Sequence, residues 1–125
     1  MAASFAEPPV TDLVRIDVAV HGPAVHVTAA GEIDSSSAPA LKRCLEAVLA
    51  GGPAQLTIDL RDVTFLDSAG LCVLAAAHRR TREQDVALRV LAASRAVVRP
   101  LQITGLWQLL GAEQVEAADD DAIVA

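Results

Sequence analysis

The chain has 125 residues, a length that suits one domain, and 53% of them are hydrophobic while only 2% are aromatic. The core must therefore be built from Ala, Val, Leu and Ile side chains. The formal net charge of −6 argues against nucleic acid and against anionic membrane surfaces as partners, because like charges repel.

The cysteines and the apolar pattern indicate the compartment. Cys44 and Cys72 are too few for a disulfide framework. The first ten residues lack the basic residues and the apolar run of a secretory signal, and no apolar stretch approaches the roughly 20 residues of a membrane span. We expect a cytoplasmic protein, with both cysteines serving as small buried apolar residues.

The two ends of the chain have the composition of tails. Residues 1–11 contain Pro8-Pro9 among small residues, so we expect a flexible N-terminal tail. Residues 118–125 include three successive aspartates and are predicted to form an acidic C-terminal tail. No internal repeat or long linker divides the residues between, so 12–117 are predicted to form a single domain.

Two short strands are predicted first. Apolar and polar residues alternate over 13–20 and again over 24–30, a period of two that is typical of half-buried strands. His21-Gly22-Pro23 between them favours a turn. The two strands are therefore predicted to pair as an antiparallel hairpin at an edge of a sheet.

A candidate functional loop and a helix follow. The loop is 31–36, with the sequence Gly-Glu-Ile-Asp-Ser-Ser. Ser37 is predicted to be the N-cap of the helix, with Pro39 in its first turn, where the missing N–H costs nothing. Apolar residues continue at helical spacing until Gly51-Gly52-Pro53 ends the helix.

The middle of the chain predicts a strand, a bridge and a second helix. Alternating apolar residues indicate a strand over 55–60, and 61–66 are interpreted as a bridge. The helix over 69–83 is apolar almost all round. Such a helix is either buried on more than one face or buries one face and presents another to a partner.

The last third predicts one more strand over 86–91 and a third helix capped by Ser94. Pro100 is expected to kink this helix or shorten its first turns, and Gly105 is expected to end it. Val115 is a candidate for a last short strand. The predicted fold class is α/β, with a mixed, mainly parallel sheet of four to five strands, an N-terminal antiparallel hairpin and three to four helices.

Motifs of self-contained catalysis are missing from the sequence. It has no Gly-x-Ser-x-Gly elbow, no Gly-x-x-x-x-Gly-Lys loop and no Gly-x-Gly-x-x-Gly fingerprint. His21, His26 and His78 show no metal-ligand spacing. We expect no enzymatic activity, no cofactor and no metal.

Ser68 is the residue of most interest, because it stands where a loop enters the second helix. The simplest interpretation is an N-cap, worth about 1 kcal/mol. Gly70 follows two positions later and costs roughly 1 kcal/mol of helix propensity relative to Ala. A glycine there would leave the backbone bare, so that another molecule can approach the Ser68 hydroxyl.

The sequence resembles a known family at three segments. These are Gly31-Glu32-Ile33-Asp34, then Thr64-Phe65-Leu66-Asp67-Ser68-Ala69-Gly70-Leu71, and then Val97 through Thr104-Gly105-Leu106. In this order and spacing they look like the STAS domains of bacterial anti-sigma factor antagonists, with similarity over roughly 13–117. The resemblance implies a single STAS-like domain.

The resemblance also implies a mechanism of partner switching in transcription regulation. In that family the serine matching Ser68 is phosphorylated by an anti-sigma factor that is a serine kinase with a histidine-kinase-like ATPase fold. The unphosphorylated protein binds this kinase and frees a sigma factor, and a metal-dependent serine phosphatase restores the active form. We expect the protein to be a monomer or a weak dimer. The implied switch and partner-binding residues besides Ser68 are Glu32, Asp34, Ser35, Ser36, Asp67, Ala69, Gly70 and Leu71.

Physical chemistry predicts how such a switch works here. A phosphate adds about −1.5 to −2 charges, which the free N–H groups and dipole of a helix N-terminus tolerate. Inhibition is therefore expected from a bulky anion beside Asp34 and Asp67 inside the interface, and not from refolding. Asp34 either orients its loop or helps the kinase to position Ser68. Ala69 stands where many relatives carry Ser or Thr, so the motif has a single hydroxyl.

Two other functions stay open. One is a STAS subunit of a membrane transport assembly, in which the domain is structural and needs no phosphorylatable serine. The other is a STAS domain that senses a small molecule or nucleotide, although no phosphate-cradling loop supports it.

Overall fold

The computed structural model describes residues 14–116. The segments predicted as tails, 1–11 and 118–125, lie outside the described residues. In chain order the elements are β1 (Val14–His21), β2 (Ala24–Ile33), α1 (Ala38–Ala50), β3 (Gln55–Leu66), α2 (Ser68–Glu83), β4 (Ala87–Ala92), α3 (Arg95–Thr104), α4 (Leu106–Leu110) and β5 (Glu113–Gln114).

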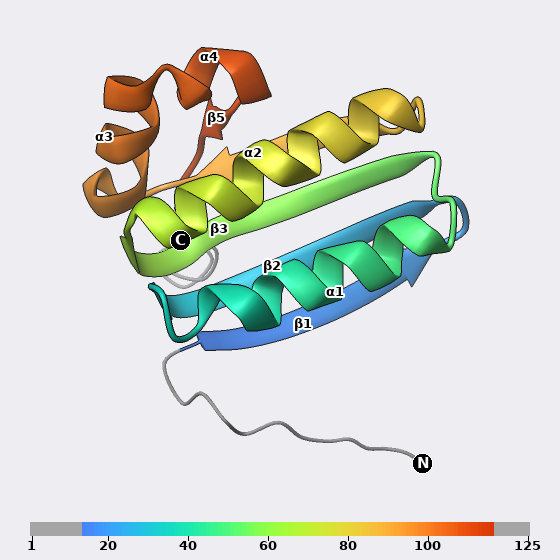
Figure 1. Cartoon of the computed structure of the whole chain (residues 1–125), viewed down its shortest axis with the longest axis horizontal. Helices are drawn as coiled ribbons and strands as arrows, with labels where there is room; N and C mark the ends of the chain where they lie inside the picture. The colour runs from blue at the N-terminus through green and yellow to red at the C-terminus, as the bar shows by residue number, and fades with distance from the viewer. Residues whose placement is uncertain (1–13, 117–125) are drawn as a thin grey trace, which may run out of the picture.

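The strands form one sheet in the order β1-β2-β3-β4-β5. β1 pairs with β2 antiparallel, and each later neighbouring pair is parallel. Helices α1 and α2 lie side by side on one face of this sheet, while α3 and α4 lie beyond its β4–β5 side (Figure 1). The predicted α/β class, the N-terminal hairpin and the mainly parallel sheet are confirmed.

The core lies between the sheet and the helices. Every buried hydrophobic side chain of the described chain is Ala, Val, Leu or Ile, as the composition requires. Period-two alternation along β3 sends Leu56, Ile58 and Leu60 to this face, and all three are fully buried. Leu41, Leu45 and Leu49 of α1 meet them at helical spacing.

The opposite face of the sheet carries a buried charge. Asp59 alternates with Ile58 and Leu60 on β3, so its side chain points away from α1 and α2, and the residue is only 2% exposed. Its Oδ2 lies 2.7 Å from Arg61 Nη2 and 3.0 Å from His26 Nε2. This cluster ties β2 to β3 on the face that the two long helices leave uncovered.

Two segments that the sequence pattern predicts as loop or bridge belong to strands. β2 continues to Ile33 and β3 continues to Leu66, and these two end residues are register partners. Register shifts interrupt the pairing of β2 with β3 between Thr28 and Ala30 and between Gly31 and Glu32. Such irregularities break the period-two alternation, which is why the sequence pattern hides the continuation.

Ser37 does not act as the predicted cap of α1. It stands at the N-cap position but makes no side-chain cap hydrogen bond. Its buried Oγ instead donates to the Glu32 carbonyl at 2.7 Å and accepts from the Asp34 N–H at 2.9 Å. Ser37 therefore stabilises the turn that leads from β2 into α1.

Helix α3 accommodates Pro100 within its ten residues and continues to Thr104. The Thr104 Oγ1 donates to the Pro100 carbonyl at 2.8 Å. Gly105 follows with a φ of 82°, a left-handed conformation that glycine adopts without strain. The predicted end of the helix at Gly105 is confirmed.

Candidate functional site

The two predicted functional loops meet at the C-terminal ends of β2 and β3. Ile33 and Leu66 pair in register, and the Asp67 N–H donates to the Ile33 carbonyl at 3.2 Å. Asp34 and Asp67 therefore begin the two loops at equivalent places on neighbouring parallel strands. α1 and α2 both start at this end of the molecule (Figure 1).

Asp34 holds its own loop in shape. One carboxylate oxygen, Oδ1, accepts from Ser36 Oγ at 2.7 Å, from the Ser36 N–H at 2.9 Å and from the Ser37 N–H at 3.2 Å. The hydrogen bond from the Ser36 hydroxyl, followed by the bond from the Ser36 N–H, lowers the pKa of Asp34 below its usual value. The carboxylate is thus ionised at neutral pH and orients the loop, while Ser35 and Ser36 are exposed.

Asp67, and not Ser68, caps α2. Asp67 has an extended backbone, and its Oδ1 accepts from the Ala69 N–H at 2.9 Å and more distantly from the Gly70 N–H at 3.4 Å. The interpretation of Ser68 as the N-cap is wrong, because the preceding aspartate reaches those N–H groups first. Ser68 is the first residue of the helix and is exposed. Within residues 14–116 its hydroxyl has no hydrogen-bond partner.

Gly70 is required by packing inside the domain. It is buried, and a Cβ at this position would collide with Leu66 Cδ1 and would lie 2.9 Å from Ile33 Cγ2. The expectation that Gly70 bares its backbone to a partner is therefore wrong. Its missing side chain lets the first turn of α2 press onto the ends of β2 and β3, which sets the position of Ser68.

The side chains on the outward face of α2 near Ser68 are small and partly apolar. Cys72 is exposed four residues after Ser68, so the expectation that both cysteines are buried is wrong for this one. Cys44 on α1 is half-buried, and burial raises the pKa of its thiol. Ala69 and Leu71 are half-buried against the core. The helix therefore buries one face and leaves another exposed.

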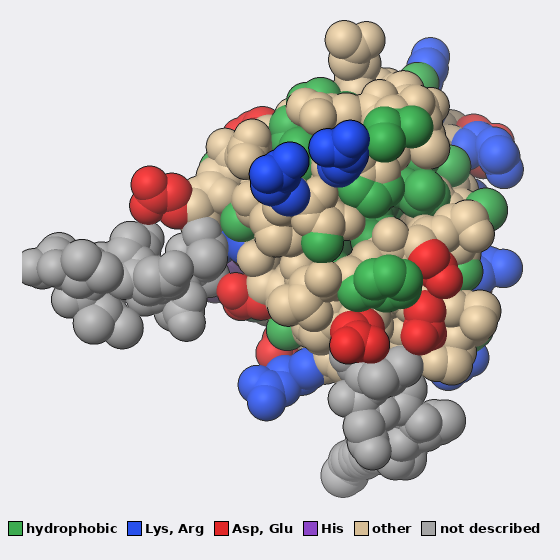
Figure 2. Space-filling model, turned by 90° about the vertical axis from the view of Figure 1, so that its left-hand side faces the viewer, with side chains coloured by type: hydrophobic (Ala, Val, Ile, Leu, Met, Phe, Trp, Pro, Cys, Tyr) green, Lys and Arg blue, Asp and Glu red, His purple; other side chains and the backbone are tan. Residues whose placement is uncertain are grey.

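Charges are separated at this end of the molecule. Glu32 is exposed beside the two aspartates, whereas Arg95 and Arg99 are exposed on α3. Figure 2 shows the end seen from the left of Figure 1, with Lys and Arg side chains near the top, Asp and Glu side chains lower down and hydrophobic surface between them. Neither arginine belongs to a motif that predicts a function from the sequence. The available signal was a basic residue in the first turn of a helix, where acidic residues are favoured.

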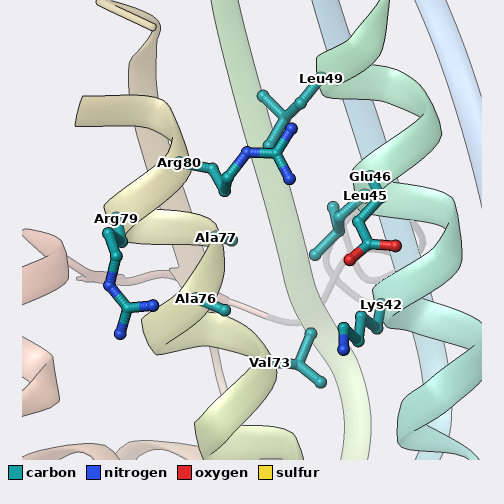
Figure 3. Close-up of a pocket in the computed structure, with 9 residues that line it drawn as sticks. All are labelled: Lys42, Leu45, Glu46, Leu49, Val73, Ala76, Ala77, Arg79 and Arg80. Carbon is teal, nitrogen blue, oxygen red and sulfur yellow. The ribbon is translucent and has the colours of Figure 1, made fainter. Parts of the chain in front are cut away.

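A hollow whose lining does not include Ser68 lies between α1 and α2. Figure 3 shows the side chains that line it. Its volume is about 140 Å³, below the range of roughly 300–1,000 Å³ typical of small-molecule sites. Its floor is apolar and its rim is charged, so it is a groove between packed helices and gives no support to nucleotide sensing. It is lined by Lys42, Leu45, Glu46, Leu49, Val73, Ala76, Ala77, Arg79 and Arg80.

The described part of the chain offers neither a metal centre nor a membrane helix. No group of three or more His, Cys, Asp or Glu side chains between residues 14 and 116 is arranged to hold a metal ion. In the same range no helix is long and apolar enough to cross a bilayer.

Comparison with known proteins gives consistent matches. A family model described as the STAS domain matches residues 15–120. The chain is 37% identical over 95 residues to the anti-sigma-F factor antagonist RsfB of Mycobacterium tuberculosis, which covers 76% of this chain and 77% of that protein. The structure resembles an anti-sigma factor antagonist from Mycobacterium paratuberculosis, with a TM-score of 0.76, 34% identity and coverage of 95% and 97% of the two chains. The fold alone is shared with the Bacillus cell fate determinant SpoIIAA in its phosphorylated form, at a TM-score of 0.64 and 17% identity over 88% of this chain and 97% of that one.

These matches extend over the sheet, both long helices and the loops around Ser68. The family model covers most of the chain, and the sequence identity to RsfB extends over about three quarters of it. Proteins of this kind are regulators and not enzymes. The chain therefore belongs to the STAS-domain family of anti-sigma factor antagonists.

Proposed function

We propose that this protein binds an anti-sigma factor serine kinase through the surface around Ser68 and thereby releases a sigma factor in the cytoplasm. Phosphorylation of Ser68 by the bound kinase ends this binding, and a serine phosphatase restores it. The names of the relatives support the antagonist role, since they are themselves anti-sigma factor antagonists.

The exposed hydroxyl of Ser68 is the single observation that carries the proposal. Asp67 performs the capping that would otherwise engage a serine at this junction. Ser68 is left exposed, without a hydrogen-bond partner in the described chain, on a helix turn held firmly by Gly70. A kinase can therefore reach the Ser68 oxygen while α2 stays folded.

The neighbouring charges explain why a phosphate at Ser68 would prevent binding. It would add about −1.5 to −2 charges beside Asp67, in a region that already carries Glu32 and Asp34. In the free protein, water solvates this anion, and the positive end of the α2 dipole favours it. In a complex the anion loses water, and every 1.4 kcal/mol of that penalty weakens the affinity about tenfold.

The proposal is tested by mixing the protein with anti-sigma factor kinases of its own organism and ATP, and by mapping the phosphate with mass spectrometry. We expect a single phosphate on Ser68. Ser68→Ala should bind the kinase without being modified, and Ser68→Asp should bind at least about tenfold more weakly. Glu83→Ala, which changes an exposed residue at the other end of α2, is the control and should be modified normally.

Two results would contradict the proposal. One is a phosphate on another residue, or on none with any kinase tested. The other is a phosphorylated protein that binds the kinase as tightly as the unmodified protein.

A further inference from the structure

An open apolar groove lies beside Ser68, between the end of β3 and α3. Its volume is about 510 Å³, and its apolar walls include the exposed Phe65 and Ile103 and the half-buried Pro100. Phe65 is 46% exposed and Ile103 is 73% exposed, values that are high for large hydrophobic side chains. An apolar surface of this kind beside polar residues is typical of a protein-binding site.

Arg95 and Arg99 flank this groove on α3. Both are exposed, and neither guanidinium has an ion-pair partner among residues 14–116. Arg95 stands at the first position of the helix, where the positive end of the helix dipole disfavours a cation. Arg99 follows four residues later, a spacing at which like charges repel. The two arginines therefore destabilise α3, so the stability of the fold does not explain why they are present.

The groove is continuous with the surface around Ser68. Phe65 is the second-last residue of β3 and lies only three residues before Ser68 in the chain. Leu66 both lines the groove and packs under Gly70. A protein that covers the Ser68 hydroxyl therefore also faces the groove. The basic and acidic patches lie on opposite sides of the hydrophobic strip on this end of the molecule (Figure 2).

We propose that this groove binds a segment of the anti-sigma factor that presents a large apolar side chain flanked by carboxylates. The groove's walls are Phe65 and Ile103, and Arg95 and Arg99 flank it. The inference rests on the proposed function and adds to it a second point of contact with the same partner. The apolar side chain fills the groove, and its neighbouring carboxylates meet the two guanidinium groups. Because the chain as a whole is acidic, with a net charge of −6, the arginine pair orients an acidic segment towards α3.

This arrangement separates docking from phosphorylation. The groove contributes affinity and orientation, whereas the phosphate is transferred to Ser68. A change in the groove should therefore raise the KM of the kinase for this protein and leave kcat unchanged when the protein saturates the kinase, whereas a change at Ser68 removes the reaction itself.

The test measures the Kd for the kinase that modifies Ser68, together with KM and kcat, for the double variant Arg95→Glu and Arg99→Glu. We expect the Kd and the KM to rise about tenfold or more, with kcat retained. The matched control is Arg79→Glu with Arg82→Glu, which reverses two exposed arginines of the second half of α2 and changes the net charge equally. The control should bind within about twofold of the unchanged protein, since distant surface charges act weakly.

A second pair of variants tests the apolar part. Ile103→Ser should weaken binding about fivefold, and because Ile103 is exposed the fold should be retained, as thermal unfolding will show. Leu109→Ser, at a 52% exposed leucine of α4, is the control and should bind normally.

Each alternative result overturns the inference in a recognisable way. If the unchanged protein binds no anti-sigma factor, the proposed function fails and the inference with it. If the unchanged protein binds the anti-sigma factor but the groove variants bind it as tightly, the inference alone fails. The inference also fails alone if the groove variants and their controls lose the same amount of affinity. If sedimentation shows self-association that Ile103→Ser abolishes, the occupant is a second copy of this chain and the proposal is wrong.

Discussion

At the start of α2, Asp67 holds the backbone while Ser68 keeps an exposed hydroxyl. The Asp67 carboxylate accepts from the Ala69 N–H at 2.9 Å, so the helix is capped without help from the serine. A capping serine would turn its oxygen towards the helix and would have to break that bond before it reacts. Capping by the neighbouring residue therefore makes phosphorylation compatible with an intact helix.

Gly70→Ala tests the packing that positions Ser68. The new Cβ would collide with Leu66 and crowd Ile33 Cγ2 at 2.9 Å, and overpacking of this kind costs about 1–3 kcal/mol. A gain of about 1 kcal/mol in helix propensity offsets part of that cost. We expect the free energy of unfolding, measured with urea, to fall by up to about 2 kcal/mol.

Gly51→Ala is the matched control for this substitution. Its φ of −79° suits any residue, and the new Cβ would meet only the Val48 carbonyl oxygen, at 3.4 Å. Its stability should stay the same or rise by up to about 1 kcal/mol. A Gly70→Ala protein as stable as the control would show that the turn has room for a side chain.

At the scale of elements, the two faces of the sheet have different structural roles. The face towards α1 and α2 builds the apolar core, whereas the opposite face carries the Asp59 cluster that joins β2 to β3. Burial pushes the pKa of Asp59 upwards, but the hydrogen bonds from Arg61 and His26 outweigh it, so that its pKa lies below the ordinary value of 3.8. Asp59 is therefore a structural carboxylate that stays ionised.

Asp59→Asn should show this coupling as a pH-dependent loss of stability. A carboxylate whose pKa is lowered by folding stabilises the protein above its unfolded-state pKa, and this contribution is lost as the pH falls through the folded-state pKa. We expect the variant to be less stable by about 1–3 kcal/mol at pH 7, and the difference to shrink below about pH 4. Urea unfolding between pH 7 and pH 3 measures both quantities.

Asp17→Asn serves as the control for this pH dependence. Asp17 is an exposed residue of β1. Its replacement should change stability by less than about 0.5 kcal/mol across the same range. A loss at Asp59 that stays constant down to pH 3 would contradict the assignment of the pKa.

At the scale of the whole molecule, the residues proposed to contact the partner lie together at one end. The ends of β2 and β3, the first turns of α1 and α2 and the exposed side of α3 all lie there (Figure 1). The sheet and the core behind this end need no rearrangement to present it. A switch built on such a surface changes the charge of the surface and leaves the fold intact.

Phosphorylation of Ser68 should therefore leave the fold unchanged. The net charge becomes more negative than −6 by about 1.5–2 units, and the added anion sits at the favourable N-terminal end of α2. We expect the circular dichroism spectrum to be unchanged and the unfolding midpoint to move by less than about 4 °C, because dipole effects of this kind are worth about 1 kcal/mol or less. Loss of helical signal on phosphorylation would contradict a switch that works by exclusion from the interface.

The sequence by itself determined the α/β class, the order of the elements and the aliphatic core, and it made Ser68 the proposed phosphorylation site. These follow from local patterns: period-two and helical spacing of apolar residues, glycine and proline at turns, and a short motif at a loop–helix junction. Only the tertiary structure decided that β2 and β3 run on to Ile33 and Leu66, and that their pairing brings Asp34 and Asp67 together. It also decided that Gly70 faces inward and that Arg95 and Arg99 flank an apolar groove. The physical reason is that these features depend on contacts between residues far apart in the chain, which no local pattern contains.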